Sequence, residues 1–550
     1  MTLNPDHKSE LYNRKADFIF FAGLAILLLI IYGPTRHGGF VTDFWGWQKE
    51  YGACGLWELW QCADIKSLQH FQHFLIAAFY KVFGISGWAW TIASVSLFLL
   101  FLWSLLKFWR KVFEFTEKKP QQFVIWASIL LVAISPYNAE VLVWRVCLHY
   151  ILAGIFLLSS ATQWLKYLSS GQKKRFWAGS LLFAISLGTL ELSLVYPVFI
   201  LPIAWYIYRC HHTTLTGFKS RMYSLIAMSF FLVCSFFLAS KWALGTWIGH
   251  YGAETHAGLN VNEFAIHYYQ YFIKHIALVR FLPHHIKTTI FELFSAGYLY
   301  TIILFVVFGV SLLMLRSAIK RQFAPEWIGI WGFLVFLLPV GNLYFMYLQL
   351  NENDRYGFLP AALLMSALVL LISRLNKQFS YGLFAVILFF NGFYLLKIRS
   401  VWKQNGEVYQ ALVQDFRWYD EDFVFVLNIP DNFEGTPMFR VLNSDSGLEQ
   451  ALLHTRNEPF RGKLVEVAMY NMINESNGVT ASWIDEQTIF VEMHEWGSWW
   501  WMNGQGLGDH SNEFYEFKTE GKGYKLMMKN IPPGAVFIYQ DGKQWKELAK

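Results

Sequence analysis

The sequence predicts an α-helical polytopic membrane protein with about 11 transmembrane helices and a C-terminal soluble α/β or mostly β domain. The 550-residue chain is 55% hydrophobic and only 15% charged, whereas soluble domains carry about a quarter charged residues. Apolar runs long enough to cross a hydrocarbon core of roughly 30 Å recur over the first 400 residues. The charge balance then reverses. Residues 1–396 hold 30 basic and 17 acidic side chains, and residues 397–550 hold 15 and 22.

Eleven apolar segments are expected to span the membrane. The first has no small-residue cleavage site after it, so it is expected to be a retained span and not a signal peptide. The segments lie near residues 17–33, 87–107, 123–143, 147–166, 176–190, 192–208, 222–243, 297–315, 327–347, 357–373 and 379–396.

Basic residues predict the orientation. Six alternate short connections hold 20 of the 30 basic residues before position 397, which places the N-terminus in the cytoplasm. Residues 1–396 then form a membrane domain with two large outer loops, about 34–86 and 244–296. Residues 397–550 form a soluble domain on the outer face. Few cysteines lie on the outer side, which favours a bacterial inner membrane with this domain in the periplasm.

The tail is expected to begin with a charged helix at about 398–418. A buried strand, Asp422–Pro430, should follow and end at its proline. Further strands are expected at Thr488–Met493, Tyr524–Met528 and Ala535–Gln540, between turns rich in Gly, Asn and Asp. In the first outer loop, Cys54 and Cys62 either form a disulfide or remain two free thiols.

Ionisable side chains at five places border spans or lie in outer loops, where they are costly and usually functional. The predicted topology puts all five on the outer side, so we expect one cavity open to that face. The places are Asp43, the Glu140/Arg145/His149 group, Glu191, the Glu352/Asp354/Arg355 group and the His70/His73 pair.

Asp43 and Arg355 are the strongest candidates for chemistry. Asp43, just after the first span, is placed to act as a general base on a hydroxyl or amine, or else it caps a short helix. Arg355, just before the tenth span, can grip a lipid phosphate bidentately, or else it pairs with Asp354 at the membrane surface.

The remaining candidates have open roles. Glu140, Arg145 and Glu191 are interpreted as contacts for sugar hydroxyls or phosphate, or as a structural polar network. His70 and His73 share one face of an amphipathic run at i,i+3 spacing. A divalent metal held by these histidines and Asp43 is possible, although no spacing is diagnostic.

Other classes lack support in the sequence. There is no Walker loop, dinucleotide fingerprint or GxSxG turn, and no basic, aromatic-interleaved patch for nucleic acid. Energy for a transfer reaction would therefore come preloaded in the substrate.

The order of these motifs resembles the GT-C superfamily of membrane glycosyltransferases, which includes protein O-mannosyltransferases and lipid A aminoarabinose transferases. The likeness covers residues 1 to about 400. It rests on Asp43, on the run from His70 to Gly84, on Pro136–Arg145, on Glu191 with Pro197, and on Asp354–Pro360. It implies a polyprenyl-phosphate sugar donor and an outer glycan, lipid or protein acceptor. It also implies Asp43 as catalytic carboxylate and Arg355 as donor-phosphate ligand. Many relatives have two adjacent acids where Asp43 stands alone.

Two other functions remain open. A transporter or flippase of a lipid-linked or small polar solute is expected to place charges at the membrane midplane between repeated halves. A non-enzymatic membrane scaffold would use the outer domain to bind a partner, and replacing Asp43 and Arg355 would then alter only assembly.

Overall fold

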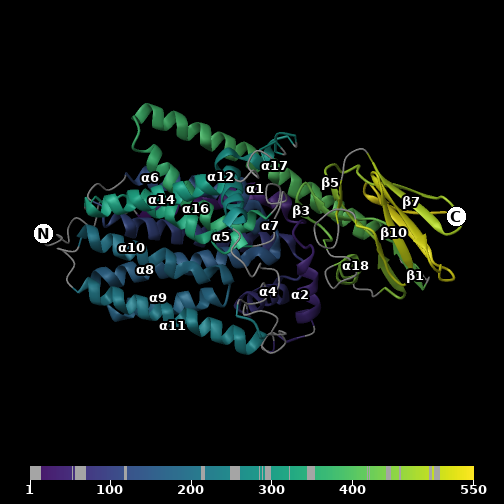
Figure 1. Ribbon diagram of the computed structural model, residues 1–550, viewed down its shortest axis with the longest axis horizontal. Coiled ribbons are helices and arrows are strands. Elements are labelled where there is room, and N and C mark those ends of the chain that lie inside the picture. The colour runs from purple at the N-terminus through teal and green to yellow at the C-terminus, as the bar shows by residue number, and fades with distance from the viewer. Residues whose placement is uncertain are drawn as a thin grey trace.

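The structure is a computed structural model of the whole chain. It describes residues 14–52, 54–55, 58, 70–116, 121–211, 217–247, 261–283, 285–287, 289–290, 299–320, 322–342, 353–417, 419, 422–440, 447–456, 460–494, 498–500 and 508–549. Helices lie side by side at the N-terminal end, and a β-rich region occupies the other end (Figure 1).

The helical part consists of long apolar helices joined by short ones. Their buried faces meet in one core around Phe101, Leu105 and Trp164. The α-helices are α1 (Arg14–Tyr32), α2 (Asp43–Gly52), α4 (His70–Phe83), α5 (Gly87–Phe113), α6 (Gln122–Ala133), α7 (Ala139–Val143), α8 (Leu148–Ser170), α9 (Lys173–Leu187), α10 (Tyr196–His211), α11 (Phe218–Leu244), α12 (Val261–Ala277), α14 (Leu299–Ile319), α15 (Glu326–Phe336), α16 (Phe358–Ile372) and α17 (Lys377–Asp415). Short 3-10 turns include η3 (Pro136–Asn138), η4 (Arg145–Cys147), η5 (Glu191–Val195), η7 (Val279–Phe281) and η10 (Asp354–Gly357).

Seven helices in the described part are long and apolar enough to cross a membrane, or eight if one bent pair counts as a span. They are compatible with a multi-pass membrane protein. Each of the eleven expected segments overlaps a helix, but several of these helices are short, such as α9 and α15. The expected count of eleven spans and the orientation therefore stay predictions.

The bent pair is α6 and α7, which meet at an angle of 53°. Helix α6 ends at Ala133, and two residues separate it from η3, which begins at Pro136. Proline has no N–H to continue the helix and disfavours helical backbone in the residue before it. The break starts a new helix that carries Glu140.

One continuous helix, α17, replaces two expected elements. The last expected span and the charged helix at 398–418 form a single 39-residue helix. At 1.5 Å per residue it is about 58 Å long. The expected charged helix is therefore present over residues 398–415, continuous with the last expected span, and α17 itself carries the chain into the β-rich region (Figure 1).

The β-rich region contains three sheets. Their strand orders are β13-β12-β1-β4, β6-β7-β11-β10-β9 and β3-β2-β5-β8. The elements are β1 (Phe423–Val426), β2 (Ile429–Phe433), β3 (Thr436–Pro437), α18 (Leu448–Arg456), β4 (Lys463–Glu466), β5 (Met469–Met472), β6 (Val479–Trp483), β7 (Thr488–Met493), β8 (Ser498–Trp500), β9 (His510–Ser511), β10 (Tyr515–Glu520), β11 (Gly523–Met528), β12 (Val536–Asp541) and β13 (Gln544–Glu547).

The three later strands that the sequence predicts are present as β7, β11 and β12. The first expected strand is instead divided. Strand β1 pairs in parallel with β4 and β12, and its interior is buried on both faces. Pro430, expected to end it, lies inside β2, where the pairing with β5 shifts register between Pro430 and Asn432. That irregularity accommodates a residue with no N–H.

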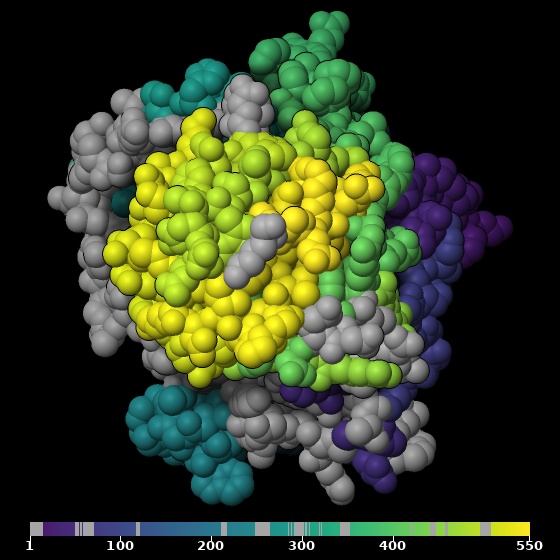
Figure 2. Space-filling model, turned by 90° about the vertical axis from the view of Figure 1, so that its right-hand side faces the viewer, coloured from purple at the N-terminus to yellow at the C-terminus, as the bar shows by residue number. Residues whose placement is uncertain are grey.

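The β-rich region covers the centre of one end of the helical part (Figure 2). At this junction α18 packs against α2, and α17 contacts both β2 and β3. Cys54, in the loop after α2, is disulfide-bonded, whereas Cys147, Cys210 and Cys234 are free. Its expected partner, Cys62, lies outside the described residues.

Candidate functional site

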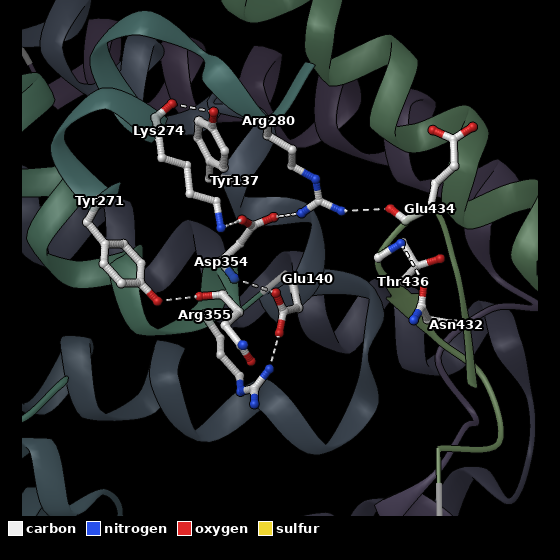
Figure 3. Close-up of polar contacts among 12 residues, drawn as sticks. Tyr137, Glu140, Tyr271, Lys274, Arg280, Asp354, Arg355, Asn432, Glu434 and Thr436 are labelled. Atoms are coloured by element: carbon white, nitrogen blue, oxygen red, sulfur yellow. Dashed lines mark hydrogen bonds and ion pairs between the residues drawn. The ribbon is translucent and has the colours of Figure 1, made fainter. Parts of the chain in front are cut away.

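A buried carboxylate, Asp354, organises the polar centre of this end (Figure 3). It begins η10, directly before α16. Lys274 of α12 approaches one oxygen at 2.5 Å, and Arg280 of η7 pairs with the other. All three side chains are at most 7% exposed. Two cations facing one carboxylate leave this group with an excess positive charge.

Glu140 connects this group to Arg355. One of its carboxylate oxygens accepts the Asp354 backbone N–H at 2.6 Å, and the other pairs with the Arg355 guanidinium. Helix α7 and turn η10 are thereby locked together (Figure 3). A charge-assisted pair of this kind fixes the orientation of a guanidinium more firmly than neutral bonds do.

Aromatic rings also hold Arg355. Its guanidinium carbon lies 5.0 Å from the centre of the Trp144 ring and 4.6 Å from that of Tyr356. Both separations are within cation–π range. Its side chain remains 16% exposed. Arg355 is therefore a charged group in a fixed position that still reaches solvent.

Arg355 also borders a narrow apolar pocket with a cavity volume of about 20 Å³. The pocket lies between α8, η5, α15 and α16. Apart from Arg355, its lining is almost entirely hydrophobic and includes Leu157, Leu190, Phe336 and Phe358. The arrangement thus places one guanidinium at the edge of a hydrocarbon-lined space.

Asp43 begins α2 and lies in a recess. Its side chain is exposed, yet protein atoms surround it so densely that burial raises the pKa of its carboxyl. A carboxyl that is both exposed and crowded by protein atoms lies in a recess of the surface. Arg355 and Arg440 are near enough to oppose this rise in pKa. The charges of Asp43, Glu140 and Arg355 all reach the buried Cys147.

Backbone strain gathers around the same groups. In the described part of the chain, the non-glycine residues with positive φ are Thr42, Leu278, Asn353, Glu434 and Arg440. Thr42 and Asn353 directly precede Asp43 and Asp354, and Leu278 lies two residues before Arg280. Each such residue costs about 1–3 kcal/mol, and strain of this kind concentrates at functional sites.

The β-rich region touches the site at two points. Arg280 donates to the Glu434 carbonyl at 3.3 Å, in the turn between β2 and β3 (Figure 3). The Thr42 backbone N–H donates to the Met438 carbonyl at 3.2 Å. The hairpin formed by β2 and β3 therefore bridges the Asp354 group and the Asp43 recess.

Arg145 lies apart from this network. It is 1% exposed and donates to neutral oxygens, namely the Thr91 and Ser94 hydroxyls and the Leu142 and Arg36 carbonyls. Its backbone N–H donates to the Gly39 carbonyl at 3.2 Å. These contacts show Arg145 holding the segment between α1 and α2 against η4. Its expected contact with a phosphate stays a prediction.

The other expected site residues lie at the margins. Glu191 is 9% exposed and begins η5, whose next residues, Leu192 and Ser193, line the apolar pocket. His73 of α4 packs its ring 4.5 Å from that of Trp47. His70 begins α4, and its side chain lies outside the described part, as does Glu352.

Sequence reasoning missed three charged members of the site, Lys274, Arg280 and Arg440. A signal existed for the first two, because they are basic residues in the second loop, which the topology places on the outer side. Nothing local distinguishes Arg440. As for a metal, the described residues contain no group of three His, Cys, Asp or Glu side chains placed to hold one.

No protein-family model matches the chain, and no curated protein sequence is similar to it.

Proposed function

We propose that the protein is a membrane glycosyltransferase that moves a sugar from a polyprenyl-phosphate donor to an acceptor. The observation that carries the proposal is the placement of Arg355. It stands between an apolar pocket and the recess of Asp43, and it acts electrostatically on that carboxylate. An amphiphilic phosphate and a polar acceptor could thus meet between these two side chains.

The donor would be held both at its hydrocarbon chain and at its phosphate. The apolar pocket matches a hydrocarbon chain in its lining but holds only about 20 Å³, so it would have to widen to admit one. A guanidinium suits a phosphate because it offers several N–H donors in one plane. The Arg355 guanidinium has five N–H donors. Among the described residues, Glu140 and the Tyr356 hydroxyl accept hydrogen bonds from it. The remaining donors are the proposed phosphate ligands.

In the reaction, an acceptor hydroxyl oxygen bonds to the anomeric carbon of the sugar. The bond between that carbon and the phosphate oxygen breaks, and its electron pair stays on the phosphate. The acceptor proton passes to Asp43, whose raised pKa makes it a stronger base than an ordinary carboxylate. Arg355 stabilises the second negative charge that develops on the lipid phosphate.

The acceptor would enter from the open side of the recess, where Asp43 meets solvent. A glycan, lipid or protein hydroxyl fits this side equally. By the orientation that the basic residues predict, the recess would open outside the cytoplasm, in the periplasm of a bacterium. No cytosolic nucleotide is then needed, because the phosphate ester bond of the donor supplies the energy.

Transfer tests the proposal directly. The purified protein in liposomes would be given a panel of radiolabelled polyprenyl-phosphate sugars and a crude envelope fraction as acceptor. We expect Asp43→Asn to lower the transfer rate by about 10²–10⁴-fold, the range for loss of a general base. Glu513→Gln, an exposed acid of the β-rich region, is the matched control. Full activity in a well-inserted Asp43→Asn protein would refute the role of Asp43.

Donor binding is tested separately with a short-chain, water-soluble polyprenyl phosphate. Loss of a charged hydrogen bond of about 1.5–3 kcal/mol predicts roughly 10–150-fold weaker binding by Arg355→Gln. Arg355→Lys should recover only part of this affinity, because an ammonium cannot reproduce the planar contacts. Lys403→Gln, on the exposed face of α17, should bind as the wild type does.

A further inference from the structure

The segment after β3 brings a second arginine to Asp43. The Thr42 backbone N–H donates to the Met438 carbonyl at 3.2 Å, so the backbone of Asp43, the next residue, lies beside the stretch that leads from Met438 to Arg440. Among the described residues, the charged groups that act on Asp43 are Arg355 and Arg440, and the Thr42 hydroxyl bonds it. One guanidinium comes from the helical part and the other from the β-rich region.

Arg440 is fixed from within the β-rich region. Its guanidinium lies 3.3 Å from the carboxylate of Asp431, which is fully buried. The Asn432 side chain donates to the same oxygen of Asp431 at 2.7 Å. The Met438 N–H donates to the Asp431 carbonyl at 2.8 Å, so the chain before Arg440 is tied to β2.

Aromatic contacts hold the two regions together beside this pair. The Trp45 indole donates to the Tyr409 hydroxyl at 2.6 Å, and the Tyr409 ring stacks on Phe439 at 4.6 Å. Trp45 also stacks on His454 of α18 at 5.7 Å. Since Trp45 and Phe439 are neighbours of Asp43 and Arg440 in sequence, these contacts fix the position of one backbone segment relative to the other.

We propose that Arg440 is a positioning residue for Asp43, so that the helical part and the β-rich region together form one site. This inference rests on the proposed function only in taking Asp43 as the reacting carboxylate. A donor phosphate would repel the carboxylate beside it, and that repulsion favours proton uptake. Flanking guanidinium groups offset the repulsion, and they hold the carboxylate ionised and in place.

The experiment measures Asp43 itself and needs no substrate. A water-soluble carbodiimide reacts with protonated carboxyls, so the pH at which labelling of the Asp43 peptide falls by half reports the carboxyl pKa. Mass spectrometry of the full-length protein in detergent, labelled at a series of pH values, gives this midpoint. Size-exclusion profiles and Tm show which variants remain folded.

Two variants should shift the midpoint in opposite directions. Arg440→Gln removes a positive charge, so the midpoint should move to higher pH. Asp431→Asn removes the negative charge that partly neutralises Arg440, so the midpoint should move to lower pH. A loss of packing between the two regions would instead move both in the same direction. Arg440→Lys should stay near the wild type, and Lys543→Gln, in an exposed ion pair of the same region, should not move it.

An unchanged midpoint in folded Arg440→Gln, or the same direction of shift in both variants, would overturn the inference. If Arg440→Gln does not fold, Asp431→Asn decides alone, and a midpoint that stays or rises counts against it. The outcome is separable from the proposed function. If the two variants shift the labelling midpoint in opposite directions but the protein transfers no sugar, the effect of Arg440 on Asp43 stands and the proposed glycosyltransferase activity fails.

Discussion

Glu140 holds Arg355 by its guanidinium while accepting the backbone N–H of Asp354 at 2.6 Å. One carboxylate from α7 thus sets both the direction of the arginine side chain and the start of the turn that carries it. The proposed phosphate ligand therefore depends on a residue that need not touch the phosphate.

Replacing Glu140 by Gln should weaken binding of a short-chain polyprenyl phosphate. The amide has a single acceptor oxygen for two donors and no charge, so Arg355 is no longer oriented. We expect about tenfold lower affinity, or 1.4 kcal/mol, measured by microscale thermophoresis. Glu114→Gln breaks the ion pair with Lys111 away from the site and serves as the control. Equal affinity in the two variants would argue against the positioning role.

Removing both cations of Asp354 should destabilise the protein far more than removing one. Lys274→Met leaves Arg280 on the carboxylate and should cost about 1–3 kcal/mol. The double variant with Arg280→Met strands a buried charge and should cost about 3–5 kcal/mol or more. Thermal unfolding in detergent measures both. Lys463→Met, which breaks an exposed pair, should change stability by less than about 1 kcal/mol.

Gly357→Ala tests how tightly the Arg355 turn is packed. An added Cβ would lie 2.3 Å from Nε2 of His275, whose ring is buried against Tyr137 and Tyr271. Overpacking of this kind costs about 1–3 kcal/mol. A second substitution, His275→Ala, should restore part of the Tm lost in Gly357→Ala by making room. If the fall in Tm of the double variant equals the sum of the two single falls, the turn relieves the clash by moving away from His275.

Lys287 should react as an amine at unusually low pH. Burial, reinforced by the nearby charge of Arg280, lowers the pKa of its ammonium to about 8 from 10.5. The unprotonated amine is the nucleophile, so acetylation of Lys287 should reach half its maximum near pH 8. Lys403, on the exposed face of α17, serves as the reference lysine. Peptide mapping after pulse labelling measures both. In Arg280→Gln the midpoint should rise, because one repelling charge is gone.

Local pattern was sufficient for many elements. The stretches Thr488–Met493 and Tyr524–Met528 are predicted as strands, and the structure pairs them directly with each other. Pro136 predicts an interruption, and α6 and α7 bend there. Local pattern did not predict that one helix continues through residue 398. Polar residues after an apolar run indicate the membrane surface, but they do not by themselves end a helix.

Only part of the candidate site could be predicted from the sequence. Asp43, Glu140 and Arg355 stand out because charged residues beside apolar runs are expensive. The sequence could not predict that they group with Lys274, Arg280 and Arg440, since those residues lie up to about 400 positions away in the chain. Lys274 lies in helix α12, Arg280 in the short turn η7 and Arg440 after β3, and no local pattern links them to one another.

Composition and hydropathy alone thus determined that the protein is rich in long apolar helices with a distinct C-terminal region, because burial of apolar surface is set residue by residue. Only the tertiary structure decided that Glu140 holds Arg355, that Lys274 and Arg280 share Asp354, and that the β-rich region brings Arg440 to Asp43. Charges interact through space over a few ångströms, and packing rather than sequence spacing sets those distances.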